Sequence, residues 1–246
     1  PDEDGRWGLS AVPRFTLSND EGFGLGVRGT AFWHRWGEEP YKTAISAQAF
    51  ATTRLVQHHY LRVDAIDAFQ LPLRIVAEAG YFQTLTFSYC GVGREASCDT
   101  GLATASARRE GLYGDEADVF VRRFHLVRFL QPYASGVVRW RLGDKPHRPE
   151  LVLGWRGHLY QPGDWSDEDD DGALDLYPYP GSLYARDFAG GEAGFASVFQ
   201  VGASLDDRDH EPDPARGYFV EASLRGAAPF VGSRWSFLGG ARATRA

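Results

Sequence analysis

The feature that most constrains this chain is a strict alternation of apolar and polar residues over long segments. In residues 23–34, one face of an extended chain would receive Phe23, Leu25, Val27, Gly29, Ala31 and Trp33. The opposite face would receive Gly24, Gly26, Arg28, Thr30 and His34. Because successive side chains of a β-strand point to opposite faces, this period of two predicts a long strand with one apolar and one polar face.

The same alternation recurs along most of the chain. It predicts about ten strands, at residues 7–18, 23–34, 41–53, 55–69, 73–88, 119–142, 149–160, 197–206, 217–227 and 233–246. No segment shows a helical period, so we expect an all-β chain with a single domain over residues 1–246. We treat 119–142 as one strand bulged at Pro132, because this choice places the long connections 89–117 and 161–196 at the same end of the sheet.

The direction of the apolar face separates two architectures. A soluble sandwich or barrel turns this face inward, whereas a membrane barrel turns it outward to lipid around a polar lumen. Here the polar face carries glycines and the charged residues Arg14, Arg28, Arg62, Arg74, Glu78, Arg139 and Arg156. Aromatic residues lie near the expected strand ends, as in interfacial girdles: Trp7, Trp33, Tyr41, Tyr60, Tyr81, Tyr133, Trp140, Tyr160 and Tyr218. These patterns favour a transmembrane, antiparallel, up-and-down β-barrel.

A charged segment between two predicted strands carries a family motif. Residues 206–218 read DDRDHEPDPARGY, in which the pattern D-x-R-D…P-x-x-G-Y is matched by Asp206, Arg208, Asp209, Pro214 and Gly217. The chain therefore resembles the bacterial surface antigen family, the outer-membrane assembly and translocation barrels of the BamA and TamA type. The opening stretch GLSAVPRFTLSNDEGFGLGV also resembles the first hairpin of such barrels. Judged on its residues alone, the charged segment also fits a solvated turn of any β protein.

The resemblance implies a location in the bacterial outer membrane and a role in outer-membrane protein insertion or in protein translocation. It implies a non-enzymatic protein that needs no cofactor, with the lipid bilayer and a client or exported protein as partners. Barrels of this family have sixteen strands, so the missing strands or a partner chain would complete the barrel. The chain begins at Pro1 and contains no Met, and we expect a processed piece of a larger protein.

Two other function classes stay open. One is a passive, porin-like or structural outer-membrane barrel; the other is a barrel hydrolase, in which His59 would act with Asp64 or Asp67. The net charge of −7 argues against a nucleic-acid partner.

Two further motifs concern the connections. Cys90 and Cys98 are the two cysteines of the chain and lie in one glycine-containing loop, which favours a disulfide and an oxidising compartment over free thiols. The segment DWSDEDDDGALD spaces Asp167, Asp169, Asp171 and Asp175 as in calcium-binding loops, with Gly172 at the sharp turn. Pro178 stands where such loops have a bidentate glutamate, so a weak Ca²⁺ site in an outer loop competes with a solvated acidic run.

Overall fold

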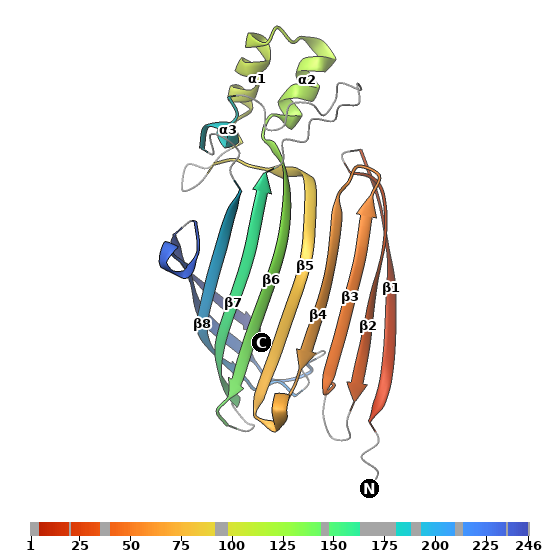
Figure 1. Ribbon diagram of the computed structural model, residues 1–246, viewed down its shortest axis with the longest axis vertical. Coiled ribbons are helices and arrows are strands. Elements are labelled where there is room, and N and C mark those ends of the chain that lie inside the picture. Colours follow the sequence, from red (N-terminus) through yellow and green to blue (C-terminus); the bar gives the residue numbers. More distant parts are fainter. Residues whose placement is uncertain are drawn as a thin grey trace.

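The protein is described by a computed structural model over residues 5–19, 21–34, 40–91, 98–143, 148–162, 181–187, 193–209, 214–234 and 236–245. Ten strands form one antiparallel sheet in which each strand pairs with its neighbours in sequence (Figure 1). They are β1 (Arg6–Ser18), β2 (Gly22–His34), β3 (Thr43–Thr52), β4 (Gln57–Ala65), β5 (Leu73–Ser88), β6 (Leu126–Arg141), β7 (Arg148–Pro162), β8 (Gly194–Asp206), β9 (Phe219–Ala227) and β10 (Phe237–Arg245). The prediction of about ten antiparallel strands is confirmed, and the chain is mostly β, not all-β as expected.

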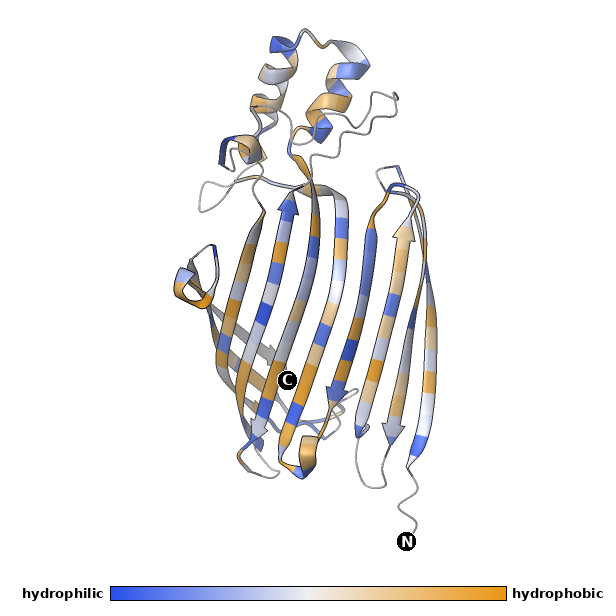
Figure 2. Cartoon of the chain, viewed as in Figure 1, coloured by the Kyte–Doolittle hydropathy of each residue, from blue (hydrophilic) through white to orange (hydrophobic). Residues whose placement is uncertain are grey.

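The two faces of the sheet differ in polarity, as the alternation of hydropathy along the strands shows (Figure 2). Residues paired across antiparallel strands share a face, so the register assigns every strand residue to one side. One face is apolar and exposed: Leu25 is 55% exposed, Leu153 58% and Leu224 56%. The opposite face carries the charged side chains, for example Arg62 opposite Glu78.

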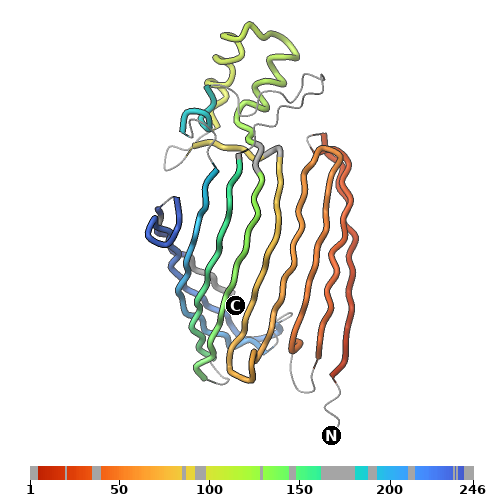
Figure 3. Tube along the Cα trace, viewed as in Figure 1, coloured from red at the N-terminus to blue at the C-terminus, as the bar shows by residue number. Residues whose placement is uncertain are grey.

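The polar face is the inner face of a curled sheet. In Figures 1 and 3, β9 and β10 lie behind the strands that precede them. Strands β6 and β9 are three spacings apart, about 14 Å along a flat sheet. Nevertheless Arg139 on β6 donates a hydrogen bond of 2.7 Å to Glu221 on β9. The two side chains can meet only over the concave side, so the polar face lines the hollow and the apolar face looks outward.

The sheet has two free edges. Among the described residues, β1 pairs with β2 alone and β10 pairs with β9 alone. The described strands therefore form an open meander and are not closed into a barrel.

The two long connections, from β5 to β6 and from β7 to β8, lie at the same end of the sheet, as expected, and the short turns β1–β2 and β3–β4 share this end (Figure 1). The helices α1 (Thr100–Arg109), α2 (Gly114–Arg123) and α3 (Leu183–Asp187) belong to the two long connections. The expectation of no helix is thus wrong, and so is the assignment of residues 119–125 to a strand. Strand β6 begins at Leu126, and Pro132 causes no register shift there; the shift in this region lies between Thr84 and Phe87 on β5.

Helices α1 and α2 form a small core of their own. Phe124 and Ala103 are fully buried, and Ala107 and Phe120 pack with them between α1 and α2. Asp99 caps α1, because its carboxylate accepts a hydrogen bond of 2.8 Å from the Gly101 amide. Among the described residues, no helix has the length and apolar character needed to cross a membrane.

The expected aromatic girdle needs a correction. Trp7 and Trp33 pair on the apolar face with ring centroids 4.9 Å apart, as predicted. Tyr60 and Tyr133, in contrast, share the polar face, because they flank Gly80 in the register. A Cβ at Gly80 would lie 2.7 Å from the Tyr133 hydroxyl, so the missing side chain makes room for that ring. Position near a strand end does not reveal which face a tyrosine occupies.

Candidate functional site

The candidate site is the polar face, where ion pairs join strands that are distant in sequence. Each link follows from the register, since residues two positions apart on a strand lie on the same face. The described carboxylates of this face on β4 to β9 are Asp64, Glu78, Glu150, Asp206 and Glu221, and each contacts an arginine.

The first cluster lies around Asp64 on β4. Arg74 holds its carboxylate through two hydrogen bonds of 2.9 Å, from Nε and from an Nη. The hydroxyl of Tyr41 donates a third, of 3.0 Å. Asp64 is only 5% exposed, so this two-point contact is what makes its charge tolerable there. The pair with His59 proposed for a hydrolase is not formed, because His59 lies on the apolar face opposite Tyr81, and Asp67 pairs with Arg141 instead.

A second, larger network crosses β6 to β9. Arg139 contacts Glu150 at 3.4 Å and Glu221 at 2.7 Å. Arg148 lies between Glu150, at 3.6 Å, and Asp206, at 3.2 Å. This alternation of charges leaves each carboxylate of the network with a cation beside it, which lowers the cost of placing them on a partly covered surface.

The turn from β8 to β9 contains the residues of the D-x-R-D…P-x-x-G-Y pattern. Asp206, at 5% exposure, accepts 2.8 Å hydrogen bonds from both Nε and an Nη of Arg208. The guanidinium of Arg208 also stacks over Phe219, 4.8 Å from the ring centroid. Asp209 then accepts hydrogen bonds from the backbone amides of Ala215, at 3.1 Å, and Arg216, at 3.2 Å. The three charges thus hold the described ends of this turn, residues 206–209 and 215–216, in place.

Gly217 completes this turn. Its φ is +102°, a region that side chains rarely adopt, and a Cβ there would lie 2.2 Å from the carbonyl oxygen of Asp207. The close approach lets the Asp207 amide donate to the Tyr218 carbonyl at 2.9 Å. Four of the five motif residues, Asp206, Arg208, Asp209 and Gly217, therefore have a defined structural role. Pro214 precedes the amide of Ala215 that Asp209 binds.

Tyrosine, glutamine and histidine side chains make further contacts on the polar face of β5 to β7. Tyr133 donates to Glu78 at 2.9 Å, and Arg156 lies over the Tyr133 ring at 5.2 Å. His158 contacts the Gln131 amide at 2.7 Å. Sequence reasoning missed these tyrosine and glutamine contacts, since neither residue type stands out in an alternating pattern.

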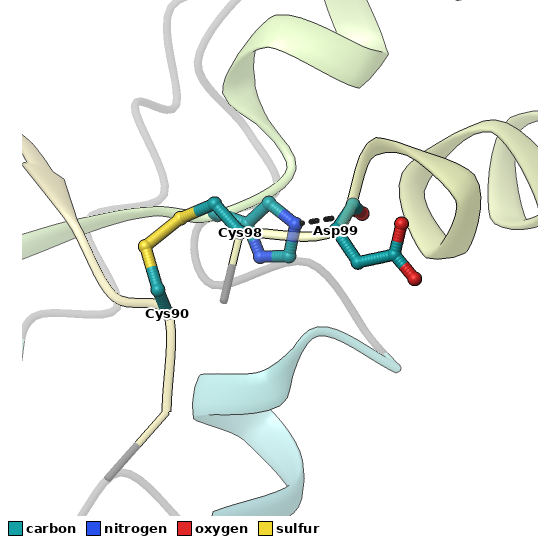
Figure 4. Close-up of a disulfide and its surroundings, with 4 residues drawn as sticks. Cys90, Cys98 and Asp99 are labelled. Atoms are coloured by element: carbon teal, nitrogen blue, oxygen red, sulfur yellow. Dashed lines mark hydrogen bonds between the residues drawn. A yellow bond between two sulfur atoms is a disulfide. The ribbon is translucent and has the colours of Figure 1, made fainter. Parts of the chain in front are cut away.

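The disulfide between Cys90 and Cys98 is confirmed. It joins the end of β5 to the start of α1, where His125 contacts the carbonyl oxygen of Asp99 at 3.2 Å (Figure 4). Next to it, the Tyr89 hydroxyl donates a 3.1 Å hydrogen bond to Asp187 of α3. Burial and this bond raise the pKa of Tyr89 to about 12. The tyrosine therefore ties the two long connections together, whereas the disulfide closes a loop within the first of them.

The predicted calcium ligands Asp167, Asp169, Asp171 and Asp175 lie outside the described residues. Within the described part of the chain, no group of three or more His, Cys, Asp or Glu side chains is arranged to hold a metal ion. His125 and His158 do not share a site: His125 is in the helical connection and His158 is on β7.

No protein-family model matches the chain, and no curated protein sequence matches it.

Proposed function

We propose that this chain is a ten-stranded portion of an outer-membrane β-barrel of the surface antigen type, which inserts outer-membrane proteins or translocates exported ones. The observation that carries the proposal is the exposed apolar face. Its side chains form a continuous surface over neighbouring strands: Leu9, Phe15, Leu17, Leu25, Val27, Ile45, Leu61, Trp140, Leu153, Phe199, Val201 and Leu224. In water such a surface would drive aggregation, whereas in a bilayer it is matched by lipid chains.

The height of this surface fits a bilayer. From Trp7 to Leu17 the apolar positions of β1 span ten residue steps, about 33 Å along the strand. A tilt of about 40° reduces this length to about 25 Å along the membrane normal, the height of the apolar band of outer-membrane barrels. Ion pairs on the concave face agree with a water-filled interior, because burying each ion pair in a dry core would carry a large desolvation penalty.

The free edges of β1 and β10 favour a barrel completed by further strands. Unpaired backbone amides and carbonyls cost several kcal/mol each in hydrocarbon, so lipid-exposed edges do not persist. Additional strands or a partner chain must satisfy them. A seam of this kind is what an insertion or translocation barrel needs, since client strands can pair with an edge that opens. The contacts of Asp206, Arg208, Asp209 and Gly217 support the family assignment on which this part of the proposal rests.

The activity is tested by reconstituting the whole protein in liposomes and adding an unfolded small outer-membrane barrel. We expect the client to fold at least several times faster than in empty liposomes, followed by its heat-modifiable shift on a gel. A matched preparation with Asp206→Ala, which disrupts the motif, should lose the acceleration. Steady ion conductance without any effect on client folding would contradict the proposal and identify a passive pore.

A further inference from the structure

The polar face of β1 to β3 differs from the rest of the sheet, because its charges are all positive. These three strands contain no Asp or Glu. On their polar face lie Arg14 and Arg28, which are diagonal neighbours, since Val12 pairs with Arg28 and Arg14 with Gly26. Within the described residues neither guanidinium contacts a carboxylate. Arg14 instead lies over the ring of Phe50, 4.2 Å from its centroid.

The two arginines line a hollow beside the free edge of β1. The hollow has a volume of about 430 Å³ and is bordered by Ser10, Val12, Pro13, Arg14, Arg28, Thr30 and Gln48. Apart from Val12 and Pro13, the lining offers guanidinium, hydroxyl and amide groups. Guanidinium groups with no counter-charge attract a carboxylate, with which they form charge-assisted, two-point hydrogen bonds.

The position of the hollow identifies what can fill it. A strand that pairs with the free edge of β1 places every second side chain on the same polar face, opposite or diagonal to Arg14. We infer that the strand which pairs with β1 carries an aspartate or glutamate on its inner face, and that Arg14 and Arg28 bind this carboxylate and so fix the register of pairing. This inference rests on the proposed function, because it takes the free edge of β1 as a pairing site.

Pairing at this edge needs a side-chain contact that selects one register. A slip of one residue would turn every side chain of the incoming strand to the wrong face, and a slip of two would keep the faces but misplace the strand along β1. The glycine-rich neighbour β2 offers few side chains that distinguish slips of two. A single carboxylate held in the hollow distinguishes them, because only one register brings it within reach of both arginines.

The test uses the protein in detergent micelles and two labelled nine-residue peptides. In one, threonine and valine alternate and glutamate replaces the central threonine; in the other, glutamine does. Fluorescence anisotropy should show the glutamate peptide bound about fivefold more tightly, and less so at high salt, as expected for a partly exposed ion pair. Arg28→Gln and Arg14→Gln should each reduce this preference. Arg156→Gln is the matched control, because Arg156 lies on the polar face of β7, far from the edge, and it should retain the preference.

Equal binding of both peptides, or a preference that survives both arginine substitutions, would overturn the inference. Inorganic phosphate that displaces both peptides equally would show a small-anion site and would also overturn it. Quenching of the intrinsic tryptophans by brominated detergent is measured in the same samples. Strong quenching without peptide discrimination would reject the register mechanism and leave the membrane barrel standing, whereas weak quenching would reject the barrel itself.

Discussion

Strands β6 to β9 and strands β1 to β3 treat charge in opposite ways on the same face of one sheet. In the first region, the described carboxylates Glu150, Asp206 and Glu221 each contact an arginine of a nearby strand. In the second region there is no acid at all, and Arg14 and Arg28 have no described carboxylate partner. Strands β6 to β9 carry their own counter-charges, and we expect these ion pairs to maintain the curl of the sheet. Strands β1 to β3 carry arginines without a described counter-charge on this face, and we expect these arginines to bind the acidic strand inferred above.

The largest expected effect comes from Asp206→Ala. This substitution leaves Arg208 and Arg148 without their shared carboxylate in a mostly covered position, which should lower the free energy of unfolding by about 3 kcal/mol. Urea titration followed by tryptophan fluorescence measures it. Arg28→Gln in the other region should change the unfolding free energy by less than about 0.5 kcal/mol, because no described acid depends on it. Equal decreases in the unfolding free energy of the two variants would contradict the claimed difference between the two regions.

Removal of the disulfide should act on the helical connection and leave the sheet intact. The cysteines are eight positions apart in the sequence, and the loss of this closed loop should destabilise the local structure by about 2.5 kcal/mol in the Cys90→Ser/Cys98→Ser variant. Hydrogen exchange should show faster exchange of the α1 amides. Amides of β7 serve as the internal control and should keep their protection; a general loss of protection would show that the connection supports the sheet.

Gly217→Ala tests the turn without removing a charge. Alanine disfavours the φ of +102°, and its Cβ would lie 2.2 Å from the Asp207 carbonyl oxygen, so we expect a loss of about 2 kcal/mol. The matched control is Gly29→Ala on β2, where the nearest atom to a new Cβ is 4.0 Å away. That control should be neutral or slightly stabilising, because glycine in a strand interior costs about 0.5–1 kcal/mol relative to alanine. A neutral Gly217→Ala would contradict the assigned turn.

The smallest effect is expected for Glu221→Gln. Arg139 loses one of its two carboxylates but keeps Glu150, so the unfolding free energy should fall by about 1 kcal/mol. Distances between spin labels on β6 and β9 should also broaden, since this contact spans the concave face. A sharp, unchanged distance distribution would show that backbone twist alone sets the curvature.

Much of the sheet could be predicted from the sequence, because the period of two is strong where one face is apolar and the other polar. The segment 73–88 was predicted with the observed bounds of β5, and the disulfide followed from the two cysteines in one loop. The motif residues Asp206 to Gly217 were found through their resemblance to a family. Their mutual contacts, however, follow from a left-handed glycine and an arginine fork, which no period reveals.

The helices were missed although a signal was present. Ala103 and Ala107 are four residues apart, as are Phe120 and Phe124, which is the spacing of one helical face. Helices α1 and α2 have ten residues each, and alanine and glycine carry little apolar contrast, so the pattern was weak beside the strands. The pairing of Arg139 with Glu221 was equally hidden, because it depends on the curvature of the sheet and not on local sequence.

The central claim is that the apolar face meets lipid and the polar face meets water. The most direct test is the accessibility of spin labels in reconstituted bilayers, with Leu25→Cys and Leu153→Cys on the apolar face and Arg28→Cys on the polar face. The account predicts that labels at the two leucine positions collide with lipid-soluble oxygen and the label at position 28 with a water-soluble nickel chelate. Labels at positions 25 and 153 that are shielded from both reagents, or that favour the nickel chelate, would contradict it.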